Sequence, residues 1–159
     1  FREVEIETGG RWREKHWRSF MYDYRTTMYF EFYEEQFRPF FDVAWDNLAD
    51  CTCRSVELQA ELFGIDTPVT RASALEGAPS SVAGIVDALG ADAVVVPEDT
   101  ERPEQLDVPV QSFAYDHPEY RQNFEGFISG VSGMDLLFNY GREAPRLLTQ
   151  GITTSASSS

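Results

Sequence analysis

Residues 115–141 read YDHPEYRQNFEGFISGVSGMDLLFNYG, a stretch that joins an apolar run to polar side chains that need partners. The apolar run comprises Met134, Leu136, Leu137 and Phe138, and the polar residues around it are His117, Tyr120, Gln122, Asp135 and Asn139. Polar groups that enter a protein core are normally hydrogen-bonded. We therefore predict that this stretch builds core and also carries candidate functional side chains.

The two ends of this stretch have different local structure. Pro118 fixes its own φ and pushes His117 toward an extended conformation, so the imidazole is presented from a stiff bend where it can titrate or donate. Further on, Ser132 is predicted to cap a short helix that Gly141 ends, with Asp135 reaching back to the free backbone N–H groups of the first turn. Taken singly, His117 and Asp135 are explained by a turn and a cap, whereas together they are candidates for catalysis.

The composition indicates one folded, acidic domain. The chain has 159 residues, of which 42% are apolar and 14% aromatic, enough to bury a core. Its 27 acidic and 13 basic residues give a formal charge of −14, which opposes binding to nucleic acid or to an anionic membrane surface. With Lys15 as its only lysine, this balance predicts a halophilic cytoplasm, where a carboxylate-rich surface stays soluble in concentrated salt.

The sequence gives no sign of a membrane span or a cofactor. No apolar run approaches the roughly 20 residues that a transmembrane helix needs, and the opening residues FREVEIE are unlike a secretory signal. Cys51 and Cys53 are too close together to staple a fold, and a CxC pair without a second Cys/His pair favours a metal site only weakly, even with His16 and His117 added. A Walker or dinucleotide loop is missing too. We expect a cytoplasmic protein whose two cysteines are reduced, and we expect it to use no metal and no cofactor.

The first half of the chain is predicted to be a strand followed by helices. Residues 1–8 alternate apolar and acidic side chains, as a strand does. Helical spacing of apolar residues extends over residues 11–25, 28–41 and 45–63. Thr26 and Thr27 are predicted to cap the second helix, and Gly64 to end the third. Because the chain opens in mid-alternation and without methionine, we interpret it as lacking an N-terminal segment.

The second half is predicted to be of the α/β type. A strand over residues 67–73, a helix over 80–89 and a short strand over 92–96 form a βαβ unit, and a third strand over 108–114 leads into the bend at His117. In such sheets, ligands bind at the carboxyl ends of the strands.

We therefore predict an α/β fold, with a small parallel sheet and an added helical subregion in a single domain over residues 1–150. Within it, residues 1–64 hold the aromatic helices and residues 65–150 the α/β part. The low-complexity tail, residues 151–159, is predicted to be disordered.

Basic residues are concentrated in the first predicted helix. Five of the chain's 13 lie there, namely Arg11, Arg13, Lys15, Arg18 and Arg25. Arginine supplies bidentate donors, so the cluster is a candidate anion or phosphate site. A solvated cationic face paired with neighbouring acids explains it equally well. His16, one turn from Trp12 and from Phe20, is likewise either a ligand or a packed histidine.

Four blocks of the sequence, in order and spacing, resemble the WbqC-like protein family of surface-polysaccharide gene clusters. They are VEIETGGRWREKHWRSF, LADCTCRSVELQAELFGIDTPVTRASAL, IVDALGAD and FAYDHPEYRQNFEGFISGVSGMDLLFNYG. The resemblance covers residues 4–148, and its WRxKH, LGAD, HPxYxQ and DLLFNxG motifs are specific as a set. Relatives usually begin with an HQPxYLPWxGY-like motif, which this sequence lacks, and commonly carry a YLSG stretch where it has VVVPEDTERPEQ.

This resemblance implies a transferase that attaches an aminoacyl or acyl group, with glycine as a candidate, to a nucleotide-linked amino sugar in polysaccharide synthesis. Such N-acylation needs a base for the amine proton, donors for an oxyanion and a cationic cradle for phosphate. We assign His117 as the base, with Asp135 orienting it and His16 as a further catalytic candidate. The substrate-binding candidates are Arg13, Lys15, Tyr24, Tyr120, Gln122 and Asn139.

Three functional hypotheses follow. A transferase predicts a pocket that brings His16 near His117. A binding module for a sugar nucleotide or glycan predicts ligand binding without turnover. A scaffold protein predicts a homo-oligomer whose interface is the aromatic helix over residues 28–41.

Overall fold

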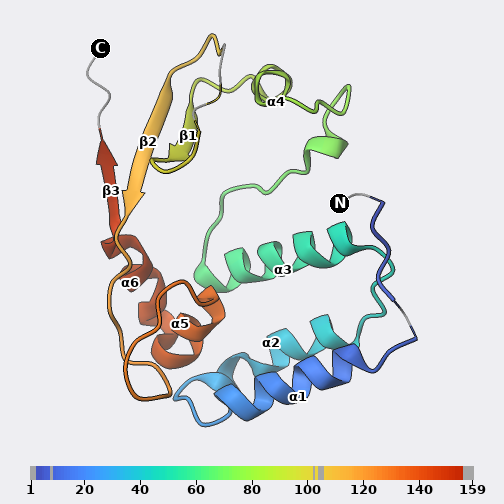
Figure 1. Ribbon diagram of the computed structural model, residues 1–159, viewed down its shortest axis with the longest axis vertical. Helices are drawn as coiled ribbons and strands as arrows, with labels where there is room; N and C mark the ends of the chain where they lie inside the picture. The colour runs from blue at the N-terminus through green and yellow to red at the C-terminus, as the bar shows by residue number, and fades with distance from the viewer. Residues whose placement is uncertain (1–2, 8, 102, 104–105, 156–159) are drawn as a thin grey trace. The chain divides into compact units, whose positions relative to one another are not determined.

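The computed structural model describes residues 3–7, 9–101, 103 and 106–155 (Figure 1). The fold is α/β, as predicted. The chain divides into two compact units, of which unit 1 comprises Phe1–Asp66 and Glu119–Leu147, and unit 2 comprises Thr67–Pro118 and Leu148–Ser159. The candidate residues therefore fall into two groups, with His117 in unit 2 and the remaining ones in unit 1.

Unit 1 is helical. Its helices are α1 (Trp12–Tyr24), α2 (Phe30–Asp42), α3 (Leu48–Phe63), α5 (Gly133–Tyr140), the short 3-10 helix η2 (Gly141–Glu143) and the first part of α6 (Ala144–Gln150). The three helices predicted for the first half are confirmed, each beginning one to three residues later than expected. None of the helices in the described ranges combines the length and the apolar character that a bilayer span requires.

The helix ends follow from local chemistry. Asn47 caps α3, its Oδ1 accepting from the N–H of Ala49 at 2.8 Å, and Gly64 ends that helix with φ of 68°. Ser132 caps α5 and Gly141 ends it, as predicted. The predicted threonine cap of α2 is wrong. Thr27 donates its hydroxyl to the carbonyl of Tyr24 at the end of α1, and Tyr29 stands at the N-cap of α2 without a side-chain hydrogen bond.

Phe138 of α5 is the centre of the core of unit 1. Its ring is fully buried, and aromatic rings from α1 and α2 surround it. Their centroids lie 5.2 Å away for Phe20, 5.1 Å for Tyr24, 5.1 Å for Phe30, 6.4 Å for Tyr33 and 5.3 Å for Phe37. Most of these pairs are edge-to-face or tilted, the arrangement that aromatic rings prefer. The aromatic spacing of α2 is thus explained by packing.

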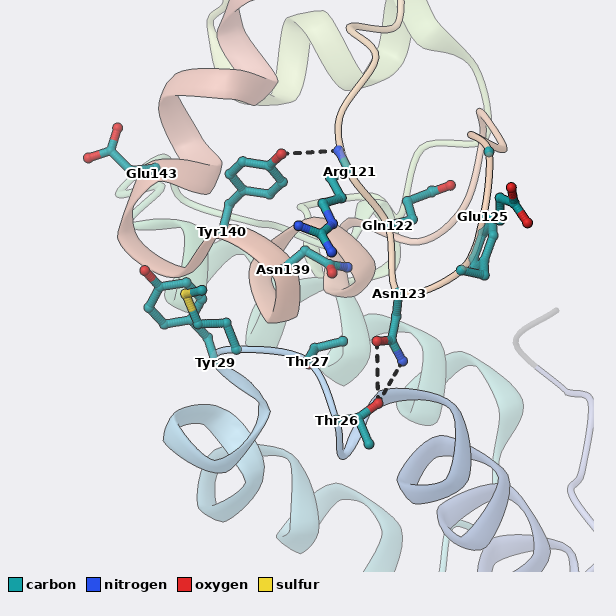
Figure 2. A pocket seen from close by; sticks show the side chains of 13 residues that line it. Thr26, Thr27, Tyr29, Arg121, Gln122, Asn123, Glu125, Asn139, Tyr140 and Glu143 are labelled. Atoms are coloured by element: carbon teal, nitrogen blue, oxygen red, sulfur yellow. Dashed lines mark hydrogen bonds between the residues drawn. The ribbon is translucent and has the colours of Figure 1, made fainter.

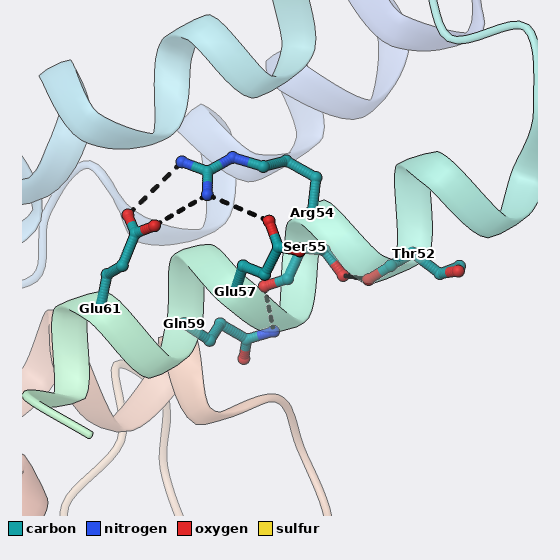
Figure 3. A network of polar contacts seen from close by, with 6 residues as sticks. All are labelled: Thr52, Arg54, Ser55, Glu57, Gln59 and Glu61. Carbon is teal, nitrogen blue, oxygen red and sulfur yellow. Dashed lines mark hydrogen bonds and ion pairs between the residues drawn. The ribbon is translucent and has the colours of Figure 1, made fainter. Parts of the chain in front are cut away.

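The exposed face of α3 carries an ion-pair network (Figure 3). Arg54 places Nη1 2.8 Å from Glu61 Oε1 and 3.5 Å from Glu57 Oε2. All three side chains are at least partly open to solvent, where such pairs contribute well under about 1 kcal/mol each. The network therefore orders the surface of the helix more than it stabilises the fold.

Unit 2 contains a three-stranded mixed sheet in the order β1-β2-β3 (Figure 1). Its elements are the 3-10 helix η1 (Ala72–Ala74), α4 (Val82–Leu89), β1 (Val94–Pro97), β2 (Val110–Tyr115) and β3 (Ile152–Ser155). β1 and β2 are parallel, with Val94 opposite Val110, and β3 is antiparallel to β2. Ser81 caps α4 and Gly90 ends it with φ of 59°.

The predicted strand over residues 67–73 does not form. Only the η1 turn occurs there, so α4 leads into β1 without linking two strands, and the parallel partner of β1 is β2. Pro68 has no N–H to donate to a ladder, which disfavours a strand at this position. The sheet contains a parallel pair of strands, as predicted. The predicted βαβ unit is absent, because α4 precedes β1 instead of connecting two parallel strands.

Two predictions for the chain ends are revised. Residues 152–155 form β3 instead of a disordered tail, because their backbone completes the ladder on the free edge of β2. Residues 156–159 lie outside the described part of the chain. Near the start, the expected strand over residues 1–8 is reduced to a single bridge between Glu5 and Asn47, with residues 1, 2 and 8 again outside the description.

The core of unit 1 gives a stability prediction. We expect Phe138→Ala to lower the free energy of unfolding by about 4 kcal/mol, because it removes the ring that α1, α2 and α5 share. The matched control is Phe32→Ala on α2, whose ring is 56% exposed, with an expected loss below about 1 kcal/mol. Urea denaturation in high salt measures both, and equal losses would contradict this description of the core.

Candidate functional site

Unit 1 contains an open pocket with a volume of about 950 Å³ (Figure 2). Its walls are the turn between α1 and α2 (residues 26–29), the segment over residues 121–126, and the end of α5 with Asn139, Tyr140 and the nearby Glu143. Gln122 and Asn139, both predicted to bind substrate, line this pocket. It is therefore the candidate site that the structure offers within one unit.

Hydrogen bonds fix the segment over residues 121–126 on both sides of the pocket (Figure 2). The N–H of Arg121 donates to the Tyr140 hydroxyl at 3.0 Å. Asn123 Nδ2 donates to the Thr26 hydroxyl at 2.9 Å and to the carbonyl of Asp23 at 2.8 Å. The segment is thus tied to α5 at one end and to the α1–α2 turn at the other.

A buried carboxylate supports the pocket from behind. Asp135 is 1% exposed, and its Oδ2 accepts from the Tyr120 hydroxyl at 2.8 Å and from Gln122 Nε2 at 3.2 Å. The Gln122 amide also bonds both backbone groups of Ile128. Its Nε2 donates to the Ile128 carbonyl at 2.9 Å, and its Oε1 accepts from the Ile128 N–H at 2.8 Å. No ion pair within the described ranges involves Asp135, so neutral donors alone satisfy this group.

The tyrosines of this network are hydroxyl donors. Burial, and after it the charge of Asp135 and a hydrogen bond to it, raise the pKa of Tyr24 to about 12. Burial and the hydrogen bond to Asp135 also raise the pKa of Tyr120. Both phenols therefore stay protonated at neutral pH and donate to the carboxylate, which excludes either from acting as a base.

The prediction that Asp135 reaches back to free backbone N–H groups is wrong. Its side chain points into the core, because Ser132 already accepts from the N–H of Met134 and the N–H of Asp135 itself bonds to the Ser132 carbonyl at 2.9 Å. All hydrogen bonds that the structure gives Asp135 come from unit 1. Its assignment as the residue that orients His117 stays a prediction.

The two histidines lie in different units. His117 follows the end of β2, with Nδ1 3.2 Å from the carbonyl oxygen of Pro118 and its ring 5.6 Å from that of Tyr115. It thus stands beyond the carboxyl end of a parallel strand, where ligands of α/β sheets are usually found. His16 is exposed on α1 and meets the ring of Trp12 edge-to-face at 5.4 Å. A shared pocket for the two stays a prediction.

Some of the basic residues in and beside α1 form ion pairs, and some line a second pocket. Arg11 and Arg18 both pair with Glu14, as the interpretation of a solvated cationic face predicts. Arg13 lines a pocket of about 320 Å³ at the start of α1. Lys15 and His16 line neither of these two pockets, and their part in holding a phosphate stays a prediction.

A model of the WbqC-like protein family matches residues 1–147. The chain belongs to the WbqC-like protein family. This family is linked to polysaccharide biosynthesis. The "Uncharacterized protein Rv1507c" of Mycobacterium tuberculosis is 28% identical over 158 residues, covering 92% of this chain and 68% of that relative. No solved structure matches the chain.

In this WbqC-like protein, the most informative pocket residue was not singled out from the sequence. Arg121 is the one cation among the residues that line the larger pocket, and it makes no ion pair with any residue in the described ranges. Figure 2 shows its guanidinium extending toward Asn139 and Tyr140. Arg121 stands in the sequence between Tyr120 and Gln122, two predicted substrate-binding residues, and this position could have indicated it. The structure adds that it makes no ion pair within the described ranges.

Cysteine and metal chemistry find little support in this family member. Both cysteines are free thiols, and burial raises the pKa of Cys51, which disfavours the nucleophilic thiolate. Within the described ranges, no group of three His, Cys, Asp or Glu side chains is arranged to hold a metal ion. The groups that the larger pocket offers for chemistry are therefore its amides, hydroxyls, the carboxylates of Glu125 and Glu143, and Arg121.

The buried network predicts the effect of removing its charge. We expect Asp135→Asn to lower the free energy of unfolding by about 2 kcal/mol, because the charged acceptor of buried donors is replaced by an amide that is itself a donor. The control is Asp66→Asn, an exposed carboxylate of unit 1, with an expected change near zero. Denaturant unfolding compares the two, and a stable Asp135→Asn variant would contradict the role given to the carboxylate.

Tyr24 gives a prediction for alkaline pH. Its pKa is raised from 10.0 to about 12 in the folded protein, so the unfolded chain releases this proton first. The resulting stability is fully present below pH 10 and is lost as pH rises toward 12. Tyr24→Phe should flatten the fall of unfolding free energy over this window relative to wild type, whereas Tyr22→Phe, an exposed tyrosine of the same helix, should not. Parallel curves for Tyr24→Phe and wild type would contradict the raised pKa.

Proposed function

We propose that this WbqC-like protein binds a nucleotide-linked amino sugar in the larger pocket of unit 1 and transfers an aminoacyl or acyl group to the sugar amine. The proposal places the reaction in the cytoplasm, in the synthesis of a surface polysaccharide. Its main support is Arg121, which lines this pocket together with amides, hydroxyls and aromatic rings and makes no ion pair within the described ranges. The volume of about 950 Å³ is also in the range of small-molecule sites.

The neutral groups of the pocket suit a sugar. Asn139 Nδ2 donates to the carbonyl of Asp135 at 2.8 Å, which fixes the amide and leaves Oδ1 to accept from a sugar hydroxyl. The rings of Tyr29, Tyr140 and Phe124 line the same pocket, and the Phe124 side chain is 47% exposed. Amide acceptors beside exposed aromatic faces match a ligand with hydroxyl groups on an apolar ring.

Arg121 suits the diphosphate. Arg121 is exposed and makes no ion pair within the described ranges, so its guanidinium is available to a ligand in a chain whose formal charge is −14. A guanidinium binds phosphate oxygens with two parallel hydrogen bonds. Glu125 and Glu143, which also line the pocket, disfavour a ligand that is anionic throughout. A sugar with one anionic segment fits this distribution of charge.

The transfer step needs a base, and the ionisable acids that line the pocket are Glu125 and Glu143. The residues that line it in the described part of the chain include no histidine or cysteine. His117 of unit 2, the base that the family resemblance implies, remains our candidate for taking the proton of the sugar amine as the new amide bond forms and the bond between the acyl group and its carrier breaks. Tyr24 and Tyr120 are unsuitable as bases because of their raised pKa values.

The same observation favours a second candidate function. A pocket lined by amides, hydroxyls, aromatic rings, two glutamates and one arginine can bind a sugar nucleotide without transforming it. Under this alternative the protein is a binding module, and the chemistry belongs to a partner. The two candidates share a ligand and differ only in turnover.

Calorimetry with UDP- and dTDP-linked amino sugars in high salt tests the binding step. We expect Arg121→Gln to weaken binding about tenfold or more, because it removes a charge-assisted contact to phosphate. The control is Arg18→Gln, an exposed arginine of α1 that lines neither pocket, with unchanged affinity. Absence of binding to wild type, or equal affinity for Arg121→Gln, would contradict the proposed ligand site.

His117→Ala separates the two candidate functions. A transferase predicts that this variant keeps sugar-nucleotide affinity and loses transfer by at least about a hundredfold, because general-base catalysis contributes that much. The measurement is mass spectrometry of the acylated sugar, with acyl and aminoacyl donors supplied in turn. Turnover that persists in His117→Ala would exclude this residue as the base, and binding without turnover in wild type would favour the binding module.

A further inference from the structure

The second pocket of unit 1, at the start of α1, has a chemistry of its own. Its volume is about 320 Å³, and the first turns of α1 and the last turn of α2 line it. Its charged lining residues are Arg11, Arg13, Arg38, Glu14 and Asp42. Three arginines against two carboxylates give a local charge of +1 in a chain whose formal charge is −14. The net charge of this pocket is therefore opposite in sign to that of the whole chain.

The protein occupies only part of the hydrogen-bonding capacity of these arginines. Arg11 gives Nε and Nη2 to Glu14, Arg38 gives Nε and Nη2 to Asp42, and Arg13 gives Nη1 to the carbonyl of Asp42. Over the described residues, Nη1 of Arg11, Nη1 of Arg38, and Nε and Nη2 of Arg13 have no partner. Three arginines that line one pocket thus keep donors that no protein group in the described ranges uses.

Local packing holds one of these donors rigidly. The guanidinium carbon of Arg38 lies 5.0 Å from the centroid of the Trp17 ring, which is itself buried. Two hydrogen bonds to Asp42, at 3.0 and 3.1 Å, fix the same group from the side. A donor held in this way loses little conformational entropy when it binds a ligand.

The start of α1 adds backbone donors. Arg11 stands at the N-cap of this helix of 13 residues, and no side chain caps it. The first N–H groups of a helix have no partner within the helix and carry partial positive charge, so they attract anions. Glu14 is the acid of this first turn, and its carboxylate oxygens are bonded by Arg11 and Arg18.

We propose that this pocket binds the phosphate group of a second ligand, a phosphate monoester or a pyrophosphate, distinct from the sugar nucleotide of the larger pocket. Residues 26–29 of the larger pocket follow the end of α1, whereas the smaller one is lined by its beginning. A helix of 13 residues is about 20 Å long, so the two sites are separated by the length of α1. Phosphate fits better than carboxylate because its three or more oxygens can engage several arginines at once.

Competition and substitution test this proposal independently of the larger pocket. Calorimetry at constant ionic strength would measure the binding of inorganic pyrophosphate to wild type and to variants. We expect Arg13→Gln to weaken pyrophosphate binding about tenfold, because it removes the arginine with the most unused donors, and Arg25→Gln, outside this pocket, to leave it unchanged. Arg38→Gln serves as a second variant, and circular dichroism shows whether each variant is folded.

The outcomes separate this site from the proposed function. In the Arg121→Gln background, which removes the proposed phosphate contact of the larger pocket, Arg13→Gln should still weaken pyrophosphate binding about tenfold. Arg13→Gln alone should leave UDP-amino-sugar affinity unchanged. Equal pyrophosphate affinity of wild type and folded Arg13→Gln and Arg38→Gln variants, or no binding to wild type, would overturn the second site even if sugar-nucleotide binding holds. Methyl phosphate and inorganic phosphate, titrated in parallel, distinguish an organic monoester from free phosphate as the source of the group.

Discussion

Unit 1 depends on a carboxylate that is buried without a cation. Asp135, 1% exposed, accepts hydrogen bonds from the hydroxyl of Tyr120 and the amide of Gln122, and its charge and a hydrogen bond to it contribute to the raised pKa of Tyr24. Burying a charge is costly unless donors surround it, so these three side chains are constrained to meet at one point. They come from α1 and from the segment before α5, which brings together parts of the chain about 100 residues apart. The aromatic cluster around Phe138 packs α5 against α1 and α2.

The larger pocket is a consequence of this constraint. The Gln122 side chain bonds Asp135 and also the backbone of Ile128. These bonds close residues 122–128 into a loop that belongs to no helix or strand. Asn123 and Tyr140 then tie the segment to the walls, and Arg121 is left extending into the pocket (Figure 2). Within unit 1, Asp135 thus holds Tyr120 and Gln122 in place, whereas its predicted role beside His117 stays a prediction.

Local signals in the sequence predicted local structure well. Ser132, Gly64, Gly90 and Gly141 mark helix ends because the chemistry of a cap involves only a few adjacent residues. Local sequence signals failed where the structure of a segment depends on a pairing partner that is distant in the sequence. The stretch at residues 67–73 reads as a strand but has no ladder to join, whereas residues 152–155 look disordered and complete the edge of β2. The inward orientation of Asp135 could not be predicted either, because it depends on Tyr24, over 100 residues earlier. Membership of the WbqC-like family was predicted because its motifs are contiguous.

Gln122 links the buried Asp135 to an exposed loop, and the backbone amide of Ile128 reports on that link. This N–H donates to Gln122 Oε1 at 2.8 Å, although the Ile128 side chain is 56% exposed and lies outside any helix or strand. Native-state hydrogen exchange, followed by NMR, measures its protection directly. The account predicts that the Ile128 amide exchanges as slowly as the amides of α5, since both open only when the Asp135 network breaks. Exchange at the rate of an unprotected loop amide would contradict it.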